Sequence, residues 1–397
     1  MKKEWKARKA LYVHSGKRFL SPDGKIYGYD KDMLISLKAR YLYLGAEVKF
    51  VQFGIPVTEQ ETADLIDLDE NGIDVIPVKY CLTPRSYKNK KETKKKIDEA
   101  VRQSDIVIAR MPSLLAYMAQ EAAIKYGIPY IVEVVACPWD ALWNYSNAAK
   151  IYAPFAFFKC KKCVAKAEYA MYVSTEFLQK RYPNTKKNCA ISDVFLQDVS
   201  DELIAKKIEQ ISKEKDKYII TTLAAVDVLY KGQHFVIEAI AKLKQKGYLF
   251  EYHIAGIGDQ TRLKEVARRF GVTDHVIFEG MLNSDQVYEL LDNTDIYVQP
   301  SLQEGLPRAV VEAMSRGCAA IGSKVGGIPE LIGNNYVFQP RNVTQIVSLL
   351  AKFADNKELL VISSKENFLK AKEFNRVILD SRRKEFYDRF IADSVEK

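Results

Sequence analysis

Two glutamates separated by seven residues, Glu304 and Glu312, stand in the stretch SLQEGLPRAVVEAMSRGC, residues 301–318. A strand-like run precedes them, and Pro307 stands where the first residue of a helix is expected, because its missing N–H is harmless there. Glu304 then belongs to the loop before the helix, and Glu312 lies about 7.5 Å beyond Pro307 along the helix axis. Carboxylates so placed can hold different parts of one extended ligand.

The groups around this pair suit an activated sugar. The amino end of a helix carries unpaired N–H groups and a partial positive charge, which favour a phosphate. Gly305 lets a ligand approach the backbone closely, and carboxylates accept hydrogen bonds from vicinal sugar hydroxyls. A nucleoside-diphosphate sugar has the matching order of ribose, diphosphate and hexose. Taken by itself, the spacing is more typical of a solvated loop residue followed by a surface position on an amphipathic helix.

Two further motifs lie upstream. Lys231 in YKGQHFVIEAIAKL stands just before an apolar helical run, where a lysine is either a point charge for a phosphate or simply solvated. Gly256 and Gly258 in AGIGD follow a strand-like run, so they are either turn glycines or glycines that border a phosphate.

Strand-like runs alternate with helical runs along the whole chain, and the apolar runs do not alternate with polar residues. Such runs indicate parallel strands covered on both faces, in βαβ units. Strands are predicted at 10–15, 46–53, 73–78, 105–110, 129–136, 169–174, 218–226, 251–257, 275–280, 295–300 and 319–324. Helical patterns lie between them, for example at 31–45, 113–127, 233–247 and 284–293.

The chain has 397 residues, which is long for one hydrophobic core, so two domains are expected. A charged helical run near 190–217 interrupts the alternation and marks the seam. We therefore predict an N-terminal domain over 1–195, a C-terminal domain over 196–375, and a helix over 376–397 that packs back toward the N-terminal domain. Both domains are predicted to be α/β and doubly wound, with ligands beyond the carboxyl ends of the strands.

The composition is that of an ordinary globular protein, with 48% hydrophobic residues and a net charge of +9. That charge suits anionic small molecules or an anionic membrane, whereas nucleic acid is not expected as a partner because the lysines are dispersed and no reader motif is present. Cys160 and Cys163 form one C-x-x-C without a second pair at zinc spacing, so no metal site is expected. The amino-terminal stretch lacks the apolar core of a signal peptide, and no apolar window reaches membrane-spanning length, which predicts a cytoplasmic protein.

The stretch from HIAGIGD to GGIPELI, residues 253–332, resembles the retaining glycosyltransferases of family 4, which are enzymes of the GT-B fold. The match includes the E-x7-E of Glu304 and Glu312, and YKGQHFVIEAIAKL looks like the family's Lys-Gly segment. The N-terminal half matches only in its strand–helix plan and in fragments such as GIPYIVEVV. The resemblance implies two Rossmann-like domains that face each other across a cleft, with the nucleotide sugar in the C-terminal one.

By this resemblance Glu304 and Lys231 are the catalytic residues, with Glu304 facing the transferred sugar and Lys231 contacting the donor phosphates. Glu312 would hold the ribose hydroxyls. The other donor-binding residues are expected to be Gly305, Leu306, Arg308, Gly256, Gly258, Gly280 and Met281.

Two features of many family members are missing. An arginine usually stands about five residues before the lysine, but Val226 is found here, and Arg308 either replaces its charge or faces the solvent. A histidine usually ends one N-domain strand, but YIVEVVACPWD has none. Glu133 and Asp140 fit a structural role as well as an acceptor-side one. The acceptor-side candidates are Arg110, Glu133, Asp140 and Gly24, the last in an altered glycine-rich turn.

The resemblance implies transfer of a sugar from a UDP- or GDP-sugar to a glycan or polyprenyl-linked acceptor, with retention, in the assembly of bacterial capsule, lipopolysaccharide O-antigen or exopolysaccharide. The leaving diphosphate would itself help to deprotonate the acceptor. No cofactor or metal ion is expected, because Lys231 and the helix N-terminus would stabilise the charge on the departing phosphate. Aromatic residues and lysines interleave over 152–173, which is typical either of a peripheral face on the plasma membrane or of a helix with a buried aromatic side. A sugar-nucleotide epimerase and a non-catalytic partner subunit remain as alternatives.

Overall fold

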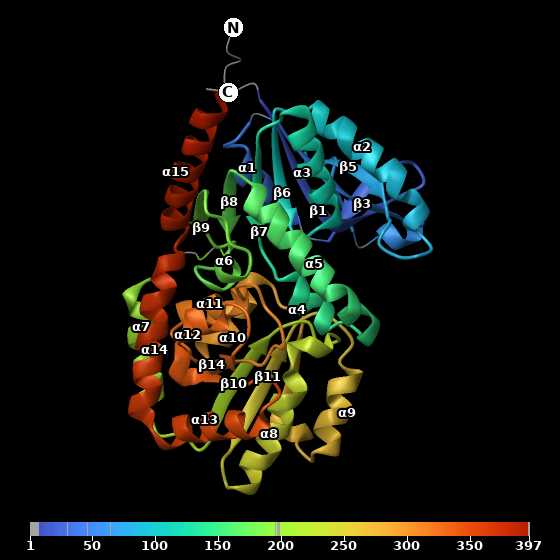
Figure 1. Ribbon diagram of the computed structural model, residues 1–397. Helices are drawn as coiled ribbons and strands as arrows, with labels where there is room; N and C mark the ends of the chain where they lie inside the picture. The colour runs from blue at the N-terminus through green and yellow to red at the C-terminus, as the bar shows by residue number, and fades with distance from the viewer. Residues whose placement is uncertain are drawn as a thin grey trace.

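The structure is a computed structural model that describes residues 8–29, 31–45, 47–63, 65–194, 196 and 199–395. The first seven residues, part of the stretch in which no signal peptide is expected, and residue 195 at the predicted domain boundary lie outside the described residues. Figure 1 shows two α/β domains stacked along the long axis of the molecule.

The N-terminal domain is built on a sheet of nine strands. Seven of them are parallel in the order β5-β3-β1-β6-β7-β8-β9. The strands are β1 (Lys9–Leu20), β2 (Ile26–Gly28), β3 (Glu47–Pro56), β4 (Ile66–Asp67), β5 (Asp74–Lys79), β6 (Ile106–Met111), β7 (Tyr130–Val134), β8 (Tyr169–Tyr172) and β9 (Lys187–Ala190).

The short strands β2 and β4 are antiparallel and were not among the predicted strands. They form because β1 continues well beyond the predicted residue 15 and then reverses at a tight turn, in which the N–H of Gly24 donates to the carbonyl of Ser21 at 3.0 Å. Gly24 has a φ of +90°, a conformation that glycine adopts without strain. Its place in this hairpin accounts for Gly24 without any contact to an acceptor.

The C-terminal domain has six parallel strands in the order β12-β11-β10-β13-β14-β15. Renumbered within the domain, this is 3-2-1-4-5-6, the order of a doubly wound nucleotide-binding fold. The strands are β10 (Tyr218–Leu223), β11 (Phe250–Ala255), β12 (Val276–Gly280), β13 (Ile296–Gln299), β14 (Ala319–Ser323) and β15 (Val337–Phe338). All four residues of β13 are buried, as expected for a strand covered on both faces. The predicted pair of doubly wound sheets is confirmed.

Helices cover both sheets, and the chain crosses from the C-terminal domain to the N-terminal domain between its last two helices. The helices are α1 (Lys31–Tyr41), α2 (Lys90–Arg102), α3 (Leu114–Tyr126), α4 (Pro138–Trp143), α5 (Asn147–Lys166), α6 (Phe177–Arg181), α7 (Asp201–Ser212), α8 (Gln233–Gln245), α9 (Thr261–Arg269), α10 (Ser284–Asp292), α11 (Arg308–Ser315), α12 (Ile328–Ile332), α13 (Val343–Asp355), α14 (Lys357–Ala371) and α15 (Arg376–Val395). Figure 1 shows α14 beside the C-terminal sheet and α15 beside the N-terminal one.

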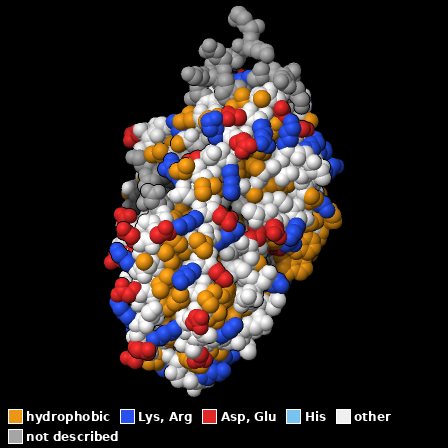
Figure 2. Space-filling model, turned by 90° about the vertical axis from the view of Figure 1, so that its left-hand side faces the viewer, with side chains coloured by type: hydrophobic (Ala, Val, Ile, Leu, Met, Phe, Trp, Pro, Cys, Tyr) orange, Lys and Arg blue, Asp and Glu red, His pale blue; other side chains and the backbone are white. Residues whose placement is uncertain are grey.

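Contacts of α15 fix this crossing. The hydroxyl of Tyr169, on β8, donates to the carbonyl of Arg389 at 3.0 Å, and its ring lies 5.2 Å from that of Phe390. Figure 2 shows the face that carries α14 and α15, where basic and acidic side chains alternate with hydrophobic ones. The C-terminal helix α15 therefore packs against the N-terminal domain.

Candidate donor site

The C-terminal sheet brings two loops together at its topological switch point. Strands β10 and β13 are neighbours, and the chain leaves them in opposite directions. In doubly wound sheets ligands bind beyond the carboxyl ends of two such strands. Lys231 ends the loop after β10, and Glu304 lies in the loop after β13. Their side chains meet with Nζ and Oε1 2.7 Å apart, and are 22% and 11% exposed. An acid and a base 73 residues apart in sequence thus form one partly buried ion pair.

Backbone contacts hold these two loops against each other. A Cβ at Gly232 would lie 2.1 Å from the carbonyl oxygen of Pro300, so only glycine fits directly after Lys231. The N–H of Leu302 donates to the carbonyl of Tyr230 at 2.7 Å. The position of Lys231 relative to Glu304 is therefore set by main chain and not only by the ion pair.

A buried polar chain also orients Glu304. The Nε2 of Gln299 donates to Glu304 Oε1 at 3.1 Å, and the hydroxyl of Tyr297 donates to Gln299 Oε1 at 2.7 Å. The N–H of Leu223 in turn donates to the Tyr297 hydroxyl at 3.3 Å. Burial raises the pKa of Tyr297 well above its usual value, so the phenol stays protonated and can donate. The sequence prediction missed Gln299, although a polar residue at the end of a fully apolar strand was a usable signal.

Glu312 lies one turn inside α11. Pro307 is the N-cap of this helix, with an extended ψ of 115°, so the helix begins at Arg308 and not at Pro307 as predicted. The Glu312 side chain is 22% exposed, and burial raises its pKa, against the opposing effect of Arg308. Arg308 is 55% exposed and reaches Glu312 at 3.8 Å. Arg308 therefore lies at the exposed edge of the site, next to Glu312.

The glycines after β11 are packed against the loop after β10. A Cβ at Gly256 would lie 2.1 Å from the carbonyl oxygen of Ala224, and one at Gly258 would lie 2.5 Å from Asp227 Oδ1. Gly280 accepts a hydrogen bond at its carbonyl from the N–H of Gly256, at 2.8 Å. Met281, next to it, is 77% exposed. This geometry explains the glycines by loop packing at the edge of the site.

The position expected to carry an arginine is part of the core. Val226 is fully buried in the hydrophobic cluster of the C-terminal domain. The guanidinium of Arg262, at the start of α9, donates to the carbonyl of Val226 at 3.1 Å. A cationic side chain from α9 thus lies beside the loop that follows β10. No local motif could have found Arg262, because it lies 36 residues further along the chain.

Two acceptor-side candidates are consumed in a buried network. Arg110 Nη1 lies 3.2 Å from Glu133 Oε2, and the same oxygen accepts from the Tyr41 hydroxyl at 2.7 Å. Arg110 also pairs with Asp193, whose other oxygen lies 2.6 Å from Arg40 Nη1. Burial alone would raise the pKa of Asp193, yet Arg110 and Arg40 hold it well below its usual value. Glu133 is 1% exposed, so these contacts hold its carboxylate inside the N-terminal domain.

Asp140 lies on α4, which touches the other domain. Both of its carboxylate oxygens lie 3.1 Å from Arg181 Nη1, and burial raises its pKa against the effect of that arginine. Asn144, just after α4, donates through Nδ2 to the carbonyl of Leu302 in the loop that carries Glu304, at 3.2 Å. The helix that carries Asp140 is thus followed directly by a residue that contacts the loop of Glu304.

The two domains are in direct contact at the site. A Cβ at Gly305 would lie 2.3 Å from the carbonyl oxygen of Val135, which follows β7. On α12, Glu330 accepts from the N–H of Thr175 at 2.7 Å and from its hydroxyl at 2.6 Å, and also from the N–H of Phe177. The structure is therefore a closed arrangement in which the loop after β13 is pressed against the N-terminal domain.

Comparison with known proteins agrees with this architecture. Residues 204–368 match the family described as glycosyl transferases group 1. Protein CapJ of Staphylococcus aureus is 32% identical over 298 residues, which cover 71% of this chain and 73% of that protein. The chain belongs to the group 1 glycosyl transferases. The putative colanic acid biosynthesis glycosyltransferase WcaL of Salmonella typhimurium is 32% identical over 160 residues, 37% of this chain and 39% of WcaL.

Solved structures extend the likeness of this glycosyltransferase to both domains. Sucrose-phosphate synthase from Thermosynechococcus elongatus has a TM-score of 0.69 and 15% identity, over 97% of this chain and all of that one. Anabaena HepE in complex with UDP-glucose has a TM-score of 0.66 and 16% identity, over 96% of this chain and all of that one. The predicted GT-B arrangement is confirmed. Within the described part of the chain, no helix is long and apolar enough to cross a membrane.

Proposed function

We propose that this glycosyltransferase moves a hexosyl group from a nucleoside-diphosphate sugar to an acceptor hydroxyl with retention at the anomeric carbon. The observation that carries the proposal is the meeting of Lys231 and Glu304 at the switch point of the C-terminal sheet, beside the amino end of α11. In doubly wound sheets this is the place where nucleotides bind.

Each side chain has a distinct task in this proposal. Lys231 and the N–H groups at the start of α11 bind the diphosphate, and Glu304 accepts hydrogen bonds from the hexose hydroxyls. Glu312, partly buried and with a raised pKa, binds the ribose hydroxyls. Gln299 is a positioning residue, since it holds the Glu304 carboxylate from behind. Arg262 supplies the second cation of the diphosphate site in place of the arginine that Val226 replaces.

The reaction we propose is a front-face displacement. The bond between the anomeric carbon and the β-phosphate oxygen breaks, and the acceptor oxygen bonds to the same face of that carbon. The acceptor proton passes to the departing phosphate oxygen. Lys231 and the helix terminus stabilise the negative charge that develops there, which is a large catalytic effect in a site shielded from water. No divalent metal ion is required, so excess EDTA leaves the turnover number unchanged.

The donor and the process follow from what similar proteins bind and do. HepE was crystallised with UDP-glucose, and WcaL is named for colanic acid biosynthesis. These names support a UDP-sugar as donor and the assembly of a bacterial surface polysaccharide as the process. The acceptor is then a growing glycan, attached to a polyprenyl lipid.

We also propose that α5 lies on an anionic membrane. Its fully buried residues are Ala153, Ala156, Cys160 and Val164. Among its aromatic residues, Phe157 packs partly buried against Trp139 and Tyr182, so the inward side carries one aromatic ring while the others face outward. The exposed hydrophobic side chains on and before this helix are Trp143, Tyr145, Ile151, Tyr152, Phe155 and Phe158. Exposed lysines accompany them, as in helices that insert apolar side chains below lipid phosphates.

The membrane proposal is tested with the full chain and phosphatidylglycerol vesicles. The double substitution of Phe155 and Phe158 by serine should abolish co-sedimentation. Leu369, equally exposed at 64% but on α14, gives the matched control when substituted by serine. If both variants bound the vesicles equally well, the proposal that α5 contacts the membrane would be wrong.

The catalytic proposal is tested by donor binding and turnover. Thermal-shift screening with UDP-, GDP-, ADP- and CMP-sugars should single out a UDP-sugar by the largest stabilisation. Glu304→Gln should then reduce kcat by at least 100-fold, whereas Lys231→Ala should reduce both kcat and donor affinity. Conversion of a UDP-sugar in the absence of any acceptor would instead establish an epimerase, and binding without turnover on any acceptor extract a non-catalytic subunit.

A further inference from the structure

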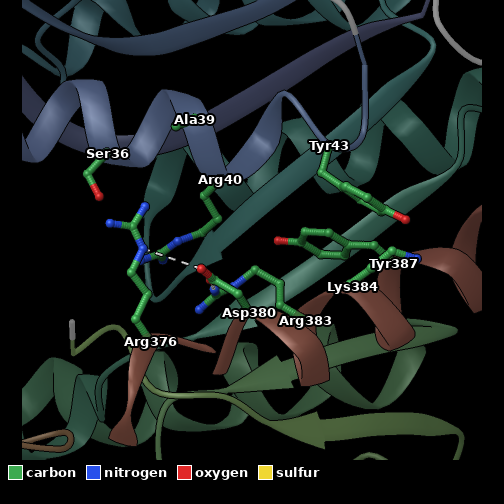
Figure 3. Close-up of a pocket in the computed structure, with 9 residues that line it drawn as sticks. All are labelled: Ser36, Ala39, Arg40, Tyr43, Arg376, Asp380, Arg383, Lys384 and Tyr387. Atoms are coloured by element: carbon green, nitrogen blue, oxygen red, sulfur yellow. Dashed lines mark hydrogen bonds and ion pairs between the residues drawn. The ribbon is translucent and has the colours of Figure 1, made fainter. Parts of the chain in front are cut away.

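A second hollow lies between α1 and α15, remote in the chain from the donor loops. It has a volume of about 200 Å³, far above the roughly 15 Å³ that one water molecule requires. Figure 3 shows its side chains converging from the two helices, with Ser36, Ala39 and Arg40 above and Arg383 and Tyr387 below. One wall thus comes from the first helix of the chain and the other from the last.

The lining of this hollow is strongly basic. Four of its side chains are cationic, namely Arg40, Arg376, Arg383 and Lys384, and Asp380 is the one carboxylate among the lining residues. Asp380 lies 2.6 Å from Arg383 and 3.5 Å from Arg376, so a single acid serves two guanidinium groups.

Two further acids pair with cations of the hollow but do not line it themselves. Asp193 pairs with Arg40 at 2.6 Å, and Asp388 pairs with Lys384 at 2.8 Å. Among the described residues that line the hollow, cationic side chains outnumber carboxylates. An anion entering from the solvent would find donors from both helices, and Asp380 as the competing carboxylate of that described lining.

Two buried polar atoms of the lining lack hydrogen-bond partners among the described residues. They are Nε of Arg383 and the hydroxyl of Tyr387, whose residues are 4% and 1% exposed. A buried donor left unpaired costs about 1–3 kcal/mol, and the great majority of such atoms are paired in folded proteins. Both atoms belong to side chains of α15 that line the same hollow as the cations. They are therefore donors of the kind that a bound anion would complete.

We propose that this hollow is a binding site for a phosphate group. A phosphate offers several acceptor oxygens, which matches a lining of guanidinium, ammonium and hydroxyl donors better than a metal ion or an apolar ligand does. Arginine in particular presents planar pairs of donors that fit two oxygens of one phosphate. The phosphate belongs either to a free phosphorylated molecule or to the headgroup of an anionic phospholipid. In both cases the ligand fastens α15 to α1, and so the end of the chain to its first domain.

The test uses inorganic phosphate as the probe and a charge placed at the rim. Ala39 lines the hollow and is exposed, so we expect both Ala39→Glu and Ala39→Gln to fold. The two variants are similar in size and differ in one negative charge. Titrations are made by calorimetry at constant ionic strength, in a Lys231→Ala background that removes the phosphate contact proposed for the donor site. We expect saturable binding to the parent and to Ala39→Gln, and at least tenfold weaker binding to Ala39→Glu.

The outcomes separate this site from the donor site. Equal phosphate affinity in the two Ala39 variants, or no saturable binding to the parent, overturns the proposal. With Lys231 intact, UDP affinity should be the same in both Ala39 variants, whereas a loss in Ala39→Glu alone would show that the substitution acts on the donor site and would also overturn it.

Vesicles identify the source of the phosphate. If Ala39→Glu sediments less than Ala39→Gln with phosphatidylglycerol vesicles, the ligand is a lipid headgroup. If the two variants sediment equally while their phosphate affinities differ, the ligand is a free phosphorylated molecule.

Discussion

Substituting alanine for Gly305 probes how closely the two domains must approach for transfer. The added Cβ would lie 2.3 Å from the carbonyl oxygen of Val135, so the two atoms must move apart by about 1 Å to reach ordinary van der Waals contact. The obstacle belongs to the backbone of the other domain, and a change of side-chain rotamer cannot relieve it. The domains must open slightly, or the loop that carries Glu304 must shift.

The expected effect is on catalysis more than on folding. A misplacement of about 1 Å at a reacting centre costs about 100-fold in rate, equivalent to about 2.7 kcal/mol of transition-state stabilisation. Each domain has a core cluster of its own, beside one cluster that spans both domains, so the melting temperature should fall by only a few degrees. We therefore expect Gly305→Ala to lower kcat by about 100-fold, while the Kd for UDP changes less than threefold.

Steady-state kinetics with the identified donor, and calorimetry with UDP, measure the two quantities. Gly271→Ala is the matched control, because its φ of +67° strains an alanine but no atom lies within 4 Å of the added Cβ. It should lose about 1 kcal/mol of stability and keep its activity. If Gly305→Ala retains more than half of the parent kcat, close apposition of the domains at Val135 is not needed for transfer.

Three other substitutions test the electrostatics. Glu312→Gln removes a carboxylate whose pKa burial raises, so the melting temperature should stay the same or rise while UDP affinity falls about tenfold in calorimetry. Asp193→Asn leaves Arg40 and Arg110 short of a buried partner and should lower the unfolding free energy by about 3 kcal/mol in urea, at unchanged m-value. Burial lowers the pKa of His14 to about 4, helped by Arg110 and by Arg18 and opposed by Asp193, so the unfolded chain binds more protons between pH 6.5 and 4. The unfolding free energy should therefore drop by at most about 3 kcal/mol as the pH falls through that window, and His14→Gln should flatten the drop. A Glu312→Gln enzyme with full UDP affinity, an equally stable Asp193→Asn, or an unchanged pH profile for His14→Gln would each refute the corresponding step.

The architecture could be predicted from the sequence because its signals are local. Buried parallel strands are short apolar runs, so β13 and most of its counterparts were found within a few residues. The E-x7-E pair was assigned to a loop and a helix for the same reason, although the helix proved to begin at Arg308. The antiparallel strands β2 and β4 escaped because they have only two or three residues, too few to show a period.

The neighbours of the candidate residues could not be predicted, because those contacts depend on the tertiary fold. Arg262 reaches Val226 only because β11 runs beside β10, and Glu133 meets Arg110 only because β7 pairs with β6. A charged residue at the end of a strand can face the cleft or a covering helix, and one position along the strand decides between them. Glu133 shares its face with Ile131, which packs in the cluster that contains residues of α1 and α15.

The two domains differ in whether backbone contacts or side-chain contacts position the charged residues at their strand ends. At the donor side, Gly232 and Gly305 permit backbone contacts that any larger residue would break, and these contacts bring Lys231 and Glu304 into place. The strand order places these residues at the switch point, in the loops that directly follow two strands. Their positions can therefore be recognised as a motif in the sequence. In the N-terminal domain, the charged residues nearest the strand ends, Arg110 and Glu133, pair with each other, and Arg110 also pairs with Asp193. These contacts join residues that are far apart in the sequence, so the N-terminal half shows a strand–helix plan but few motifs that can be read locally.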